Sequence, residues 1–88
     1  MNGEYYINIP QKVAEAHISL GAKVLYGQIN RLSRKEGYCY ASNKYLGGLL
    51  NVSERTVSRM IGELKQSNFI VSKETIEDGL TKRYLYII

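Results

Sequence analysis

The sequence has few of the residues from which disulfides, metal sites and catalytic centres are built. Cys39 is its only cysteine and His17 its only histidine. A single cysteine forms no internal disulfide, and this usage is typical of a cytosolic protein. The acidic residues Glu54, Glu63 and Glu74 show no pairing that suggests acid–base chemistry, and no metal-ligand spacing or glycine-rich phosphate loop is present. The sequence therefore predicts a cytoplasmic protein that is not an enzyme and has no catalytic residue, metal or cofactor.

Long hydrophobic runs and a signal peptide are also missing. The longest apolar stretches are only a few residues, far short of the roughly 20 that cross a bilayer. The N-terminal segment MNGEYYINIPQ lacks the basic start and apolar centre of a secretory signal. With 44% apolar residues, the 88-residue chain is expected to form one small globular domain with no membrane partner.

Charge is unevenly distributed along the chain. The net charge is +4, from 12 basic and 8 acidic residues. Glu4, Lys12 and Glu15 are the charged residues before Lys23, so the basic surplus lies from Lys23 onward. A surplus of this size suits a polyanion such as nucleic acid, although many proteins are this basic.

Residues 42–65, SNKYLGGLLNVSERTVSRMIGELK, have the pattern of two short helices joined by a tight turn. Ser42 can cap the first helix, and Asn51 tolerates the left-handed conformation that ends one. Gly47 is expected where this helix must approach the second. The residues with the spacing of its buried face are Leu46, Leu49 and Leu50.

The turn and the second helix follow directly. Val52 is expected to be buried between the two helices, and Ser53 can cap the second one. The core residues expected on this helix are Val57, Met60, Ile61 and Leu64. Two helices across a three-residue turn form a helix-turn-helix, which sets its second helix into the major groove of DNA.

The outward face of the second helix carries two arginines at helical spacing. Arg55 and Arg59 are four residues apart and project from the same side, with Ser58 between them. Arginine can donate two parallel hydrogen bonds to guanine or to a phosphate, and serine can donate to either. An ordinary solvated helix with an arginine pair is the alternative. The preceding turn and the following hairpin favour DNA binding.

The remaining elements are predicted by the same local rules. A short strand at residues 5–9 is ended by Pro10, and a helical turn or two follows at 11–16. A long helix at 20–35 is capped by Ser19 and stopped by Gly37. A second short strand is expected at 38–41.

The C-terminal part is predicted to be a β-hairpin. Strands are expected from Phe69 and over 81–88, and Asp78-Gly79 between them is a strong turn signal. The tip is acidic, so its arms are expected to contact the DNA backbone. The basic residues on the arms are Lys73, Lys82 and Arg83.

These elements predict an α+β, mainly α fold: a winged helix-turn-helix with a small three-stranded antiparallel sheet. The whole chain, residues 1–88, is expected to be a single DNA-binding domain. Its predicted parts are an N-terminal extension at 1–18, the helix-turn-helix at 42–65 and the wing hairpin at 69–88.

Residues 21–70 resemble the winged helix-turn-helix domain at the N-terminus of replication initiators (replisome organisers) from phages and plasmids of Gram-positive bacteria. The most specific pieces are GAKVLYG, GYCYASNKYL and NVSERTVSRMIGEL. YYINIP and the hairpin fit as well, so the resemblance covers nearly the whole chain. The sequence departs from it at Gly47 and Asn51, where alanine and glycine are more usual.

This resemblance implies binding to double-stranded DNA at an origin during replication initiation. The residues that it places at the DNA are Ser53, Glu54, Arg55, Ser58 and Arg59. The residues that it places near the phosphates are Ser42, Asn43 and Lys44. It also implies either a domain after Ile88 that recruits helicase or its loader, with replication proteins as partners, or a stand-alone DNA binder. Because 88 residues offer a small reading surface, tight specificity would need a homodimer, further copies on repeated sites, or that second domain.

Two other functions fit the same fold, because function depends on the site and its partners. A transcriptional regulator would bind an operator as a dimer. A winged helix used only for protein interaction would show no affinity for DNA, and the arginine pair argues against it.

Overall fold

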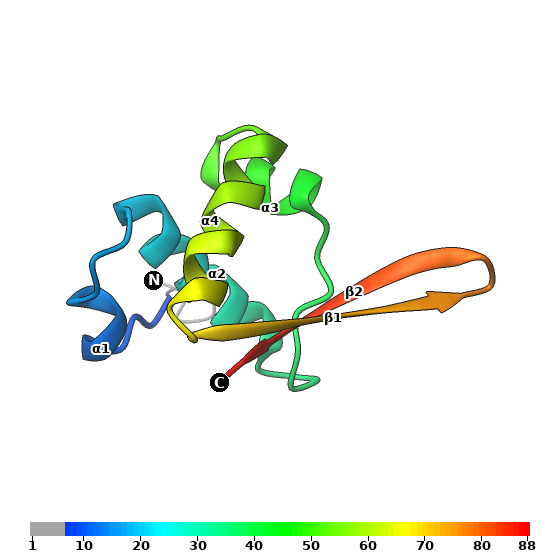
Figure 1. The fold of residues 1–88 in the computed structure, drawn as a ribbon, viewed down its shortest axis with the longest axis horizontal. Coiled ribbons are helices and arrows are strands. Elements are labelled where there is room, and N and C mark those ends of the chain that lie inside the picture. Colours follow the sequence, from blue (N-terminus) through cyan, green and yellow to red (C-terminus); the bar gives the residue numbers. More distant parts are fainter. Residues whose placement is uncertain (1–6) are drawn as a thin grey trace, which may run out of the picture.

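The computed structural model describes residues 7–88, which form helices followed by a two-stranded antiparallel hairpin that extends away from them (Figure 1). This agrees with the predicted α+β, mainly helical class. No helix among the described residues is long and apolar enough to cross a membrane. In chain order, the elements are α1 (Gln11–Ala14), α2 (Leu20–Ser33), α3 (Asn43–Leu50), α4 (Glu54–Gln66), β1 (Ile70–Glu77) and β2 (Leu80–Ile87).

Three of the helices begin at a serine whose hydroxyl oxygen accepts a backbone N–H from the first turn. This contact satisfies a donor that the helix itself leaves unpaired. The O···N distances are 3.1–3.2 Å. All three caps were predicted from the sequence, and the pairs are Ser19 with Ala22, Ser42 with Tyr45, and Ser53 with Thr56.

The predicted helix ends depend on left-handed backbone. Asn51 ends α3 with φ 57° and ψ 46°, as predicted. Gly37 has φ 87°, and its N–H donates to the carbonyl of Ser33. The helix α2 ends at Ser33 rather than at the expected residue 35, because the Arg34 N–H already bonds back only three residues, to Arg31.

The core lies where α2, α3 and α4 meet the base of the hairpin. The predicted stripe of α4 is confirmed: Val57, Met60, Ile61 and Leu64 are all buried. The other buried apolar residues are Val13, Ala22, Leu25, Tyr26, Ile29, Cys39, Leu46, Ile70 and Leu85.

The predicted burial of Leu49 and Val52 is wrong, because their side chains are 39% and 37% exposed. The face that α3 turns to the core is made by Leu46 and Gly47, with Leu50 partly buried. Leu49 lies off this face. At the turn, the backbone of Val52 lies against Gly47, and the Val52 N–H donates to the Gly47 carbonyl at 2.9 Å.

The hairpin forms around the predicted Asp78-Gly79 turn. Both residues have positive φ, 55° and 77°, the combination that a two-residue type I′ turn requires. The strands pair in register from Ile70 opposite Ile87 to Glu77 opposite Leu80.

The predicted third strand at 38–41 is wrong, since this segment contributes a single bridge. Cys39 exchanges two backbone hydrogen bonds of 2.8 Å with Leu85. Soon afterwards the chain leaves the sheet, because Ser42 must reach the N-cap of α3.

The strand predicted at 5–9 falls partly outside the described residues, and residues 7–9 within them form no strand. Ile7 instead packs against Gly27 of α2, where a Cβ would lie 2.8 Å from the Ile7 side chain.

Two adjacent glycines of α3 provide a test of this packing. A Cβ on Gly47 would lie 2.6 Å from the carbonyl oxygen of Val52, whereas one on Gly48 would meet nothing within 4 Å. We expect Gly48→Ala to stabilise the protein by about 1 kcal/mol through helix propensity. Gly47→Ala is expected to destabilise it by about 1–3 kcal/mol through overpacking. Urea unfolding measures both, and equal stabilisation by the two variants would contradict the close approach.

Candidate nucleic-acid interface

The outer face of α4 presents the polar residues predicted to meet DNA. Arg55, Ser58 and Arg59 are exposed on the side opposite the buried stripe. Neither Arg55 nor Ser58 makes a side-chain hydrogen bond within residues 7–88. Their donors are thus open to solvent on a helix whose other face is fixed in the core.

The first turn of α4 holds two further predicted residues. Ser53 accepts the Thr56 N–H, and its own hydroxyl donates to Thr56 Oγ1 at 3.1 Å. Glu54 is exposed in the first helical turn, where a carboxylate is stabilised by the positive end of the helix dipole. Both side chains therefore support the start of the helix as well as facing outward.

The N-terminal end of α3 brings together residues from distant parts of the chain. Lys44 is exposed and Ser42 serves as the N-cap. The side-chain oxygen of Asn43 accepts a hydrogen bond of 2.6 Å from Arg83 Nη1. Arg83 Nη2 also donates to the carbonyl of Ala41 at 2.7 Å.

Arg83 is thereby engaged inside the protein. Its side chain is partly buried, and burial lowers the pKa of the guanidinium from its usual value. The two bonds attach strand β2 to the N-terminal end of α3. No local sequence pattern predicts this contact, because the partner Asn43 lies 40 residues away in the chain.

The other two predicted residues of the hairpin are Lys73 and Lys82, both exposed. The Lys73 ammonium lies 5.5 Å from the ring centroid of Tyr86, within cation–π range. Near the acidic tip, Glu77 accepts hydrogen bonds from the hydroxyls of Thr75 and Tyr84, and these lower the pKa of its carboxyl group. The arms of the hairpin therefore carry the cations Lys73 and Lys82, and the region near its tip carries the hydrogen-bonded carboxylate of Glu77.

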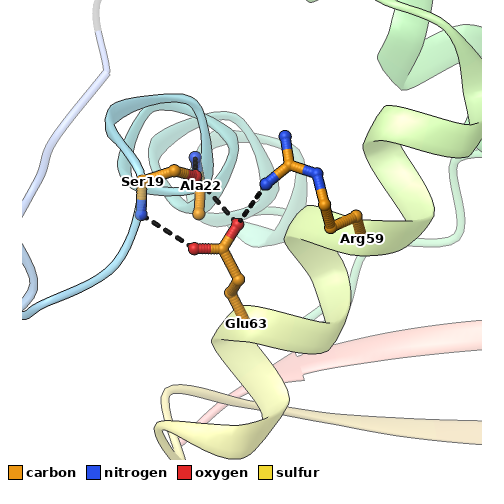
Figure 2. Close-up of polar contacts among 4 residues, drawn as sticks. All are labelled: Ser19, Ala22, Arg59 and Glu63. Carbon is orange, nitrogen blue, oxygen red and sulfur yellow. Dashed lines mark hydrogen bonds and ion pairs between the residues drawn. The ribbon is translucent and has the colours of Figure 1, made fainter.

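Arg59 differs from Arg55, because Glu63 holds it. Arg59 Nη1 lies 3.0 Å from Glu63 Oε2, and the same carboxylate accepts two hydrogen bonds from Ser19 at the start of α2 (Figure 2). The Ser19 contacts, with the positive charge of Arg59, outweigh desolvation and lower the pKa of Glu63. Sequence reasoning missed this role, although the spacing of Arg59 and Glu63 is that of a helical ion pair.

Nothing in the described part of the chain resembles a metal or thiol centre. Residues 7–88 place no three histidine, cysteine or acidic side chains where they could hold a metal ion. Cys39 is buried, and burial raises the pKa of its thiol, opposite to the shift that activates a nucleophile.

The sequence of these elements matches a known protein family. The family described as "Helix-turn-helix domain" matches residues 16–70, more than half of the chain, which cover α2, α3, α4 and the first residue of β1. No curated protein and no solved structure matches the chain.

The internal contacts of Arg83 predict a role in stability. Arg83→Ala would remove two charge-assisted hydrogen bonds, so we expect it to lower the free energy of unfolding by about 2 kcal/mol. Lys82→Ala, one residue away on the exposed face, is the matched control and should change stability by less than about 0.5 kcal/mol. Equal urea midpoints for the two variants would show that Arg83 does not anchor the hairpin.

Proposed function

The chain belongs to the helix-turn-helix domain family, and we propose that it binds double-stranded DNA in a sequence-specific manner. The observation that supports this is the exposed face of α4, with Arg55, Ser58 and Arg59 opposite a fully buried stripe. A rigid helix with such a face can enter the major groove, where side chains of these types distinguish base pairs.

The proposal divides the basic residues by role. Arg55, Ser58 and Arg59 contact base edges. Lys44 on α3 and the hairpin residues Lys73 and Lys82 are exposed. They contact phosphates and so fix the register of the protein on the duplex. Ser42, Asn43, Ser53 and Glu54 lie close to the DNA, and Arg83 acts mainly by holding the hairpin that carries Lys82.

We further propose that the DNA site lies in a phage or plasmid replication origin. The support is the resemblance of GAKVLYG, GYCYASNKYL and NVSERTVSRMIGEL to replisome organisers. One α4 helix reads few base pairs, so binding of several copies to repeated sites would supply the missing specificity. Other replication proteins are the proposed partners of that assembly.

Selection from a random duplex library at two salt concentrations tests the function. We expect one enriched motif, arranged as direct repeats. A palindromic motif would contradict origin binding and favour a regulator that binds an operator as a dimer. Binding without a motif, falling steeply with salt, would contradict sequence reading. No binding at either salt would contradict DNA binding altogether and leave protein interaction.

The role of Arg55 can be tested on the selected site. Arg55→Ala should weaken binding by about 1–3 kcal/mol and relax the base preference at one position, because a bidentate base contact is lost. Fluorescence anisotropy with the selected duplex and its single-base variants measures both effects. Unchanged affinity and preference in a folded Arg55→Ala protein would contradict the assignment.

Lys82→Ala provides the contrasting prediction. It should weaken binding to all duplexes alike and lower the slope of log affinity against log salt by about 1, because a phosphate contact is lost. A change of base preference without a change of slope would assign Lys82 to a base instead.

A further inference from the structure

The carboxylate of Glu63 lies at a junction between two helices. The Ser19 N–H donates to Oε1 and the Ser19 hydroxyl to Oε2, each at 2.8 Å, and Arg59 Nη1 donates to Oε2 at 3.0 Å. Figure 2 shows Glu63 between the start of α2 and the outer face of α4. One acidic side chain thus joins the start of α2 to a residue proposed to read DNA.

Glu63 is held at the start of α2 by contacts other than its ion pair with Arg59. In a capping box, the third helical residue is an acid or amide that accepts the N–H of the N-cap residue. In α2 that position is Ala22, which cannot accept it, and Glu63 supplies the acceptor from α4. The start of α2 also packs closely on α4 here, since a Cβ on Gly21 would lie 2.6 Å from the sulfur of Met60.

Because Ser19 already holds the Glu63 carboxylate, the Arg59–Glu63 ion pair forms at a smaller entropic cost. A pair of exposed charges usually contributes little, because ordering two long side chains offsets the attraction. Here Glu63 is 23% exposed and already ordered by Ser19, so only Arg59, 59% exposed, has to be ordered. The pair therefore restrains Arg59 at a smaller entropic cost.

The restraint leaves the reading edge of Arg59 open. Only Nη1 bonds to Glu63, so Nε and Nη2 can still donate two parallel hydrogen bonds to a guanine or a phosphate. Figure 2 shows the other terminal nitrogen of the Arg59 guanidinium turned away from the Glu63 carboxylate. Arg55, one turn earlier, has no such ion pair within residues 7–88.

We propose that Glu63 is a positioning residue that orients Arg59 for base reading and weakens the attraction of Arg59 to phosphates. This inference rests on the proposed DNA-binding function. In it, Glu63 lowers affinity for any DNA, because a phosphate would have to compete with a fixed carboxylate for Arg59. It raises discrimination, because the guanidinium arrives at the bases already oriented.

Glu63→Gln tests the proposal, because the amide oxygen can still accept the Ser19 N–H while the ion pair is lost. Kd is measured over a salt series for the selected duplex and for a scrambled one. We expect tighter binding to the scrambled duplex, with a slope steeper by about 0.9 for one extra phosphate contact. The ratio of scrambled to selected Kd should fall on the order of threefold to tenfold, part of the discrimination of one bidentate contact.

Glu15→Gln is the matched control, since it removes one negative charge from an exposed residue of the loop that follows α1. Its discrimination ratio should equal that of the wild type. The double variant Arg59→Ala/Glu63→Gln should show the ratio of Arg59→Ala alone, because Glu63 acts through Arg59. A further fall in the double variant would overturn the proposal in favour of a general distortion of α4.

A second comparison leaves Glu63 intact and so does not depend on how Glu63→Gln folds. On scrambled DNA, where no base matches it, the unpaired Arg55 is expected to contact a phosphate, so Arg55→Ala should lower the salt slope. Arg59→Ala should leave that slope nearly unchanged and lower discrimination. Equal loss of slope in the two variants would overturn the proposal. A wild-type protein that does not distinguish the two duplexes would instead refute the proposed sequence-specific function.

Discussion

The placement of α4 depends on its contact with the start of α2. Gly21 brings the α2 backbone so close to Met60 that a Cβ at this position would lie 2.6 Å from the Met60 sulfur. Beside this contact, Ser19 and Glu63 are joined by two hydrogen bonds. Apolar packing alone would leave α4 some freedom to slide or rotate on the core. A pair of directional bonds to one carboxylate removes it, so the outer face has a defined orientation.

A second set of bonds extends this order to the hairpin. Strand β2 is joined to the segment before α3 by the backbone exchange between Cys39 and Leu85. Farther along the strand, the Arg83 guanidinium reaches Ala41 and Asn43. These joints lie just before and at the N-terminal end of α3, which packs on α4 through Gly47 and the turn. Helix and hairpin therefore belong to one connected frame, and a short two-stranded ribbon gains the support that it lacks alone.

The sequence was informative wherever a few adjacent residues decide the structure. Serine caps, the left-handed Asn51 and the Asp78-Gly79 turn are such cases, and each was predicted. The pairing of Arg83 with Asn43 and of Ser19 with Glu63 joins residues 40 and 44 positions apart, beyond any local rule. Leu49 was misassigned because in an eight-residue helix three leucines are compatible with two choices of buried face. The DNA contacts themselves stay predictions, since they depend on a partner.

These internal bonds also change how the charge of the protein should be understood. A net charge of +4 counts every basic residue equally, yet Arg83 is committed to the fold and Arg59 is paired with Glu63. Affinity for any DNA depends on the phosphates that cations can neutralise, and not on net charge. In the proposed DNA binding, two committed arginines leave only a modest electrostatic contribution. The proposed sequence selectivity then depends on the geometry of α4, which Ser19 and Glu63 help to hold in place.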